Sequence, residues 1–203
     1  MRKFRRCTRA MRPPSPNPPV TGGGEGHRGV RQMVERGASD WLTNDAAFRR
    51  ECEQGHAWER WVGSYLLLHS LAVRLPEQSI REDVRDAPAY RNSADLWVGS
   101  IRLEVKSRSE TFTSPADFPY PEMFVDTVRK WHARNPKPAA MIVVSRPTGA
   151  MVAVSPRSEH RWVVIRRRDG VRGYSDDFYA APRECWRSVG ELVAWLKTRR
   201  EAK

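Results

Sequence analysis

Two runs of alternating polar and apolar residues flank the dipeptide Gly99-Ser100 near the middle of the chain. A two-residue connection with glycine in first place is typical of a tight β-hairpin with a type II′ turn. In such a hairpin, residues whose numbers sum to 199 lie opposite each other, and successive side chains point to opposite faces. The pattern predicts an apolar face of Leu96, Val98, Ile101, Leu103 and Val105, and a polar face of Asp95, Trp97, Arg102, Glu104 and Lys106.

Three segments carry apolar residues at helical spacing. The first covers residues 46–70, and Gly55 is expected to divide it into a short helix and a longer one. The second lies between Pro121 and Pro136, where the apolar residues at i, i+4 and i+7 are Phe124, Val128 and Trp131. The third covers residues 188–200 and begins with a capping-box pattern, which predicts an amphipathic C-terminal helix.

Four short apolar runs outside the hairpin predict strands, at residues 71–75, 139–145, 151–154 and 162–165. The run at 139–145 is continuous, which indicates a strand buried on both faces in a sheet that helices cover. Helices and strands therefore alternate along the chain, and the sequence predicts an α/β domain with additional strands and a helix toward the C-terminus.

The first 32 residues are rich in Arg, Pro and Gly and contain few large apolar side chains. They carry eight Lys or Arg against one acid, a net charge of +7, which leaves +5 for the other 171 residues. We expect residues 1–40 to form a disordered basic tail and residues 41–203 to form the folded domain. The tail fits either a non-specific DNA-binding arm or an incidental extension.

Three widely spaced cysteines, without a CxxC pair, argue against a disulfide framework or a zinc knuckle and favour a reducing cytoplasm. No apolar run approaches the length of a membrane span, and the basic N-terminus lacks the apolar stretch of a signal peptide. The sequence thus predicts a cytoplasmic protein without membrane contact.

The predicted register places the carboxylates of Asp95 and Glu104 directly opposite each other, which is destabilising unless a cation compensates. A hard divalent cation shared by both carboxylates is the simplest compensation. Lys106 lies on the same face, within reach of a phosphate or of a metal-bound water. These are the parts that metal-assisted phosphodiester hydrolysis needs. Asp83 and Asp86 are rival ligands, but no pattern positions them.

Asp95, followed after eight residues by Glu104-Val105-Lys106, resembles the active-site signature of the PD-(D/E)XK nuclease superfamily. The proline that often precedes the aspartate is replaced by Ser93-Ala94, at a position that varies in the superfamily. The resemblance covers about residues 46–155 and implies a restriction-endonuclease-like αβββαβ core. That core is a mixed central sheet flanked by helices, to which this chain adds C-terminal strands and a C-terminal helix.

The resemblance also implies roles for individual residues. Asp95 and Glu104, helped by the carbonyl of Val105, would bind Mg²⁺ or Mn²⁺. Glu59, an acid followed four residues later by glycine, is similar to the glutamate on the opening helix of many members and would complete the site. Lys106 would orient or deprotonate the attacking water, although an unperturbed lysine is a poor base at neutral pH.

Basic and hydroxyl residues near this motif are candidates for phosphate contact. They are Ser107 and Arg108 after the catalytic strand, and Arg129 and Lys130 in a predicted helix end that also holds His132 and Arg134. The triplet Arg166–Arg168 fits either a solvated strand end or a contact with phosphates.

The favoured function is a Mg²⁺-dependent endonuclease acting on nucleic acid, with DNA the expected substrate. Its size and single domain are similar to those of phage, mobile-element or defence nucleases. The alternatives are a module of the same fold that binds nucleic acid or protein without cutting, and a hydrolase of another phosphodiester. A homodimer would allow paired cuts, but no sequence feature predicts one.

Overall fold

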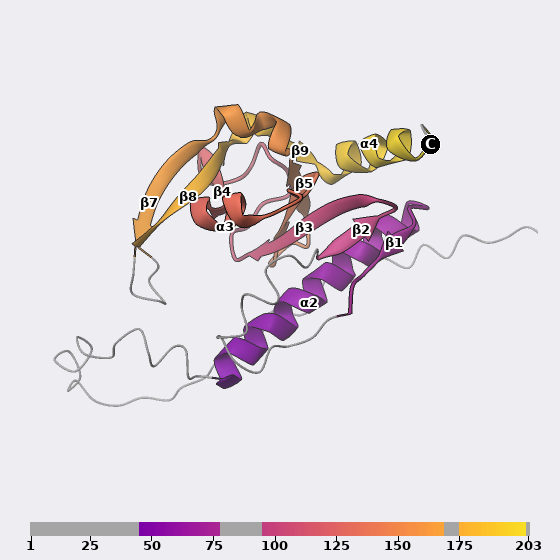
Figure 1. The fold of residues 1–203 in the computed structure, drawn as a ribbon, viewed down its shortest axis with the longest axis horizontal. Coiled ribbons are helices and arrows are strands. Elements are labelled where there is room, and N and C mark those ends of the chain that lie inside the picture. Colours follow the sequence, from indigo (N-terminus) through magenta and orange to yellow (C-terminus); the bar gives the residue numbers. More distant parts are fainter. Residues whose placement is uncertain (1–44, 78–94, 169–174, 202–203) are drawn as a thin grey trace, which may run out of the picture.

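The computed structural model describes residues 45–77, 95–168 and 175–201 (Figure 1). The predicted tail at 1–40 and the rival ligands Asp83 and Asp86 lie outside the described residues. The described part is an α/β fold of two sheets and three α-helices, whose larger, mixed sheet lies between helices on one face and the smaller sheet on the other.

The larger sheet has six strands in the order β1-β2-β3-β5-β6-β9. Its strands are β1 (Val73–Arg74), β2 (Leu96–Val98), β3 (Ile101–Arg108), β5 (Ala140–Ser145), β6 (Met151–Val154) and β9 (Trp186–Ser188). Only the β3–β5 pair is parallel, and the other neighbours are antiparallel. All six residues of β5 are buried, which confirms the prediction of a central strand covered on both faces.

The β2–β3 hairpin has the predicted register. Val98 lies opposite Ile101, and Leu96 lies opposite Leu103. Gly99 has a φ of 58°, whereas Ser100 has a negative φ, which is the backbone signature of a type II′ turn. Glycine is needed at the first position because other L-residues are strained there. The short connection therefore determines which side chains of β3 face each side of the sheet.

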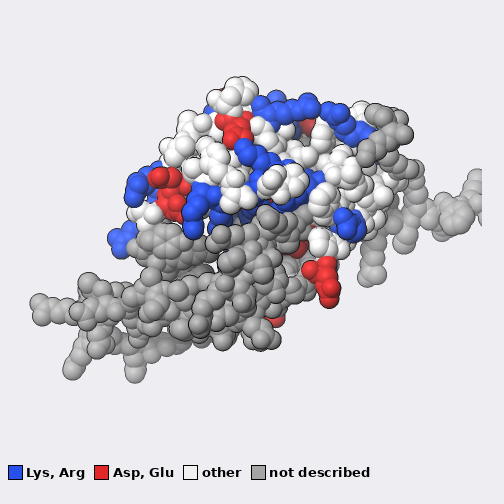
Figure 2. Space-filling model, in the orientation of Figure 1, with Lys and Arg blue, Asp and Glu red and all other residues white. Residues whose placement is uncertain are grey.

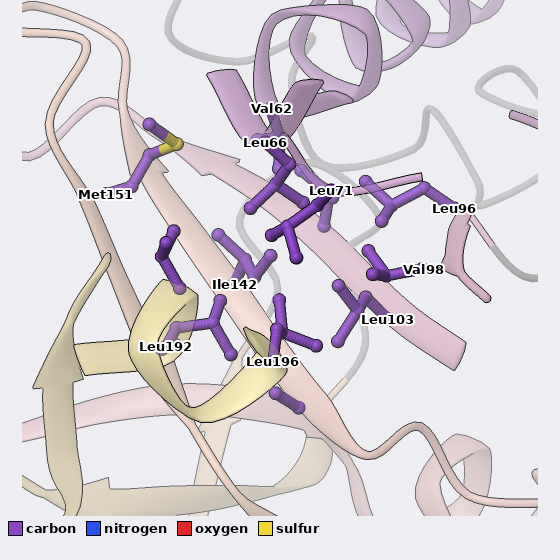
Figure 3. Close-up of a cluster of buried hydrophobic side chains, with 14 of the residues drawn as sticks. Val62, Leu66, Leu71, Leu96, Val98, Leu103, Ile142, Met151, Leu192 and Leu196 are labelled. Atoms are coloured by element: carbon purple, nitrogen blue, oxygen red, sulfur yellow. The ribbon is translucent and has the colours of Figure 1, made fainter. Parts of the chain in front are cut away.

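Helix α2 (Asp45–Leu68) is continuous, so the predicted break at Gly55 is wrong. A single glycine inside a helix costs about 1 kcal/mol. Packing offsets it, because Trp58, Val62 and Leu66 recur at i, i+4 and i+8 and are buried against the sheet. Figure 3 shows Val62 and Leu66 of α2 meeting Ile142 of β5 and, from α4 (Val189–Glu201), Leu192 and Leu196.

The second sheet has the order β4-β8-β7 and comprises β4 (Glu122–Thr127), β7 (Val163–Arg168) and β8 (Ser175–Pro182). The prediction of a helix from Pro121 was wrong, because only α3 (Val128–Ala133) is helical. Met123 and Val125 are both buried at a spacing of two, and this alternation pairs β4 with β8. The helix begins where Thr127 accepts a hydrogen bond from the Lys130 amide.

The remaining elements close the second core. Two 3₁₀ helices, η2 (Pro156–Arg161) and η3 (Arg183–Cys185), connect the sheets. The predicted capping box of α4 is confirmed, since the Ser188 amide donates to Glu191 and the Glu191 amide donates to the Ser188 hydroxyl. Strands β8 and β9 were not predicted. No helix within the described ranges is long and apolar enough to cross a membrane.

Candidate active site

The predicted polar face of the hairpin points toward the second sheet. Glu104 and Lys106 lie beside Met141 and Val143 of β5, which belong to the core under that sheet. Asp95 precedes β2, and its Oδ2 accepts a hydrogen bond of 2.6 Å from the Val105 amide. The structure therefore brings Asp95, Glu104 and Lys106 to one place, as the hairpin register predicted.

Glu104 is almost fully buried, with 3% of the residue exposed. Arg134, the C-cap residue that follows α3, donates to both of its carboxylate oxygens at 2.7 and 2.5 Å. Lys106 donates to the same carboxylate at 3.1 Å. A buried carboxylate that accepts two charged donors is held in one orientation, because moving it would leave charges unpaired in a poorly solvated site.

Asp126, at the end of β4, is the second buried acid that Arg134 contacts. Two nitrogens of the guanidinium donate to its Oδ2 at 2.7 and 3.2 Å, while its Oδ1 accepts from the Thr127 amide at 2.9 Å. Arg134 thus joins two carboxylates that come from different sheets. Asp126 was not predicted as a site residue. Arg134 was grouped only with the basic residues of the predicted helix end.

The charges of this cluster shift one another's pKa values. The pKa of Asp95 is raised to about 8, chiefly by burial; Glu104 and Glu59 also raise it, whereas Lys106 and the hydrogen bond from the Val105 amide lower it. Burial opposes the charged forms of Lys106 and Asp126 as well. Nearby carboxylates nevertheless raise the pKa of Lys106, and Lys106 and Arg134 lower the pKa of Asp126. Asp95 is therefore the member whose negative charge is least compensated.

Glu59 lies on α2, half-buried, and close enough to Asp95 to affect its pKa. The described residues nevertheless contain no group of three acidic, His or Cys side chains gathered as a metal site. Both oxygens of Glu104 are turned to Arg134. The predicted ligands are neighbours, but Glu104 would have to share its carboxylate between Arg134 and a cation.

The predicted phosphate-binding residues are not all at this site. Ser107 pairs with Val144, whose side chain lies in the core under the helices, so Ser107 points away from Glu104. Arg108 points toward the second sheet and donates to the Phe124 carbonyl at 2.8 Å. Arg129 and Lys130 are exposed on α3. Figure 2 shows Lys and Arg side chains gathered over β7, α3 and η2.

Comparison of the chain with models of protein families, with curated proteins and with solved structures finds no match. The chemistry of the site is therefore inferred from its geometry and charges. The fold and site define an α/β protein with a buried cluster of carboxylates, a lysine and an arginine between its two sheets.

Proposed function

We propose that this chain is a divalent-metal-dependent nuclease that hydrolyses phosphodiester bonds, most readily in DNA. The observation that carries the proposal is the position of Asp95 and Glu104 beside Lys106 on the β2–β3 hairpin, with Glu59 approaching from α2. Paired carboxylates with a neighbouring ammonium group suit metal-assisted attack of water on a phosphate.

The charge of the cluster suits a divalent cation. Asp95, Glu104, Glu59 and Asp126 supply four carboxylates, and Lys106 and Arg134 supply two cations, so the fully ionised cluster carries a net charge of −2. One divalent cation would balance that charge, and carboxylate oxygens are ligands that Mg²⁺ and Mn²⁺ prefer. The raised pKa of Asp95 supports the same conclusion, because a cation beside it would stabilise its charged form.

Asp95 and Glu104, with the carbonyl of Val105, would hold the ion, and Glu59 would approach it directly or through water. When bound, such an ion polarises the phosphate and lowers the pKa of a bound water. The side chain of Lys106 is 37% exposed, against 4% for Glu104. Lys106 is therefore placed to meet the substrate phosphate and to stabilise charge that develops on it.

The order of elements supports a restriction-endonuclease-like core. Helix α2 is followed by β1, β2 and β3, and β5 then pairs parallel with β3 after α3. This order matches the expected αβββαβ succession with β4 added before a short α3. The strands β6 to β9 and α4 extend the core toward the C-terminus.

The second candidate is a protein of this fold that binds nucleic acid or another protein in the cytoplasm without cutting. The pairing of both Glu104 oxygens with Arg134 favours it, because that contact competes with a metal. The burial of Asp95 beside Glu104 and Glu59 favours the nuclease, since that arrangement raises its pKa and costs stability at neutral pH unless a cation is bound.

The test is cleavage of plasmid DNA, single-stranded DNA and RNA in Mg²⁺, Mn²⁺ or EDTA. Asp95→Asn and Glu104→Gln are the site variants. Asp117→Asn and Glu159→Gln are matched controls, because these acids are hydrogen-bonded outside the cluster, Asp117 exposed and Glu159 partly exposed. The proposal predicts metal-dependent cutting that both site variants lose and both controls keep. Cutting in EDTA, or in the site variants, contradicts it.

A further inference from the structure

Two arginines from different sheets meet at the aromatic ring of Phe124. The Arg108 guanidinium lies 5.9 Å from the ring centroid, and that of Arg167 lies 5.2 Å from it. Arg108 is near the end of β3 and Arg167 is on β7, so 59 positions separate them in the sequence. The ring is half-buried and is itself held by an edge-to-face contact with Phe178 at 5.4 Å. Both guanidinium groups therefore pack against the same aromatic ring, whose position is fixed.

Among the described residues, no carboxylate forms a salt bridge with Arg108 or Arg167, and the one hydrogen bond of the Arg108 side chain goes to the Phe124 carbonyl. Burial lowers the pKa of Arg108, Glu110 opposes that shift, and Arg167 adds to it. Two guanidinium groups at one ring repel each other, and an anion placed between them would be bound by both.

The arginine pair continues the polar face of the candidate active site. Glu104, Lys106 and Arg108 alternate on β3 and so lie on one face, spaced about 6.6 Å from one another for a strand rise of about 3.3 Å per residue. Asp126, which Arg134 links to Glu104, is close enough to Arg108 to affect its pKa. A phosphate chain that passes Lys106 can therefore reach Arg108 and Arg167 next.

We propose that Arg108 and Arg167, together at Phe124, bind a phosphate of a nucleic-acid backbone and hold the strand beside the candidate active site. The inference rests on the proposed function in taking nucleic acid as the partner. It adds the smaller sheet to the binding surface, because Arg167 lies on β7, an edge strand of that sheet.

Protection of a sheet edge is the competing explanation for arginines on β7, since charges on an edge strand prevent pairing with other chains. That role does not distinguish the two faces of the strand. Arg166 and Arg167 are neighbours and point to opposite faces: Arg166 lies 3.6 Å from Asp177, whereas Arg167 turns to Phe124. Edge protection therefore predicts the same importance for both arginines, whereas phosphate binding at Phe124 depends on Arg167 alone of the two.

The experiment measures binding of the full chain to a fluorescent 20-base-pair DNA duplex, and to one of its strands, by anisotropy in EDTA at several salt concentrations. The variants are Arg167→Gln and, as matched control, Arg166→Gln, which removes the same charge from the neighbouring position. Arg167→Lys keeps the charge and tests whether the planar group is needed. Thermal melting of each variant shows whether the fold is kept.

We expect Arg167→Gln to weaken binding about tenfold and to reduce the salt slope by about one, since one phosphate contact is lost. Arg166→Gln should stay within about twofold of the wild type, and Arg167→Lys should keep the salt slope. Equal effects of Arg166→Gln and Arg167→Gln, or none, overturn the inference. So does a wild-type chain that binds neither DNA form.

Failure of the inference is distinguishable from failure of the proposed function, because binding is measured without metal and cleavage is measured separately. If the wild type cuts DNA and Arg167→Gln binds DNA as the wild type does, the nuclease proposal stands and the arginine site is ruled out. If Arg167→Gln weakens binding and the wild type cuts no DNA, the arginine site stands and the nuclease proposal is ruled out.

Discussion

Replacing Arg134 with methionine removes the cation that contacts two buried carboxylates at once. The side chains of Glu104 and Asp126 are 4% and 6% exposed, and Arg134 itself is 10% exposed. Methionine keeps most of the length of the side chain but offers no charge and no hydrogen-bond donor. The variant leaves both acids in place, so the site retains two buried negative charges with Lys106 as the nearest cation.

The expected loss follows from these contacts. Removing one partner of a buried ion pair typically destabilises a protein by about 3–5 kcal/mol, because the other charge stays buried and unpaired. Arg134 donates two hydrogen bonds to Glu104 and two to Asp126, but Lys106 still holds Glu104. We therefore expect the free energy of unfolding to fall by about 3 kcal/mol, equivalent to roughly 10 °C in Tm.

The assay is urea denaturation in EDTA at pH 7, with Lys137→Met as matched control. Lys137 also forms an ion pair, with Glu159 at 2.8 Å, but both side chains are partly exposed. Its loss should therefore change the free energy of unfolding by less than about 1 kcal/mol. Adding Glu104→Gln to Arg134→Met should recover part of the stability, since it removes one unpaired charge. A loss below about 1 kcal/mol in Arg134→Met, or no recovery, would refute the reasoning.

Three further predictions concern single residues. The pKa of Asp95 is about 8 in the folded protein and about 4 in the unfolded chain. Without metal, Asp95 therefore lowers the free energy of unfolding by about 1.4 kcal/mol for each pH unit between pH 4 and pH 8. Asp95→Asn should abolish this pH dependence, so its Tm should exceed that of the wild type above pH 6 and equal it near pH 4. Parallel curves of Tm against pH for the two proteins would contradict the prediction. Gly99→Ala should lower stability by about 1 kcal/mol in urea because φ is 58°; a urea midpoint equal to that of the wild type contradicts the turn. Gly63→Ala should raise the urea midpoint, because a Cβ there would lie 3.5 Å from Val73 and the helix gains up to about 1 kcal/mol; a lower midpoint contradicts this.

Local rules predicted the elements that depend on neighbouring residues. The Gly99-Ser100 turn determined the register of β2 and β3, and with it the shared face of Glu104 and Lys106. The capping box at Ser188 predicted the start of α4. These predictions succeeded because a turn type or a cap depends on only a few consecutive residues.

Predictions failed where distant segments decide the structure. The residues of β4 have apolar side chains at both helical and strand spacing, and pairing with β8 selects the strand. Strand β8 itself begins with polar residues and gave no signal. Arg134 and Asp126 could not be placed at the site, because their contact with Glu104 exists only after the second sheet packs on the first.

Comparison of Lys106→Met with the wild type tests the nuclease proposal most directly, because a contaminating nuclease would cut equally in both preparations. The measurement is the single-turnover rate of plasmid cleavage at saturating Mn²⁺, with Mn²⁺ binding measured by calorimetry and Lys137→Met as control. We expect Lys106→Met to cut at least about 100-fold more slowly at a temperature where it is fully folded, while it binds Mn²⁺ as the wild type does. Equal cleavage by Lys106→Met and the wild type would contradict the account.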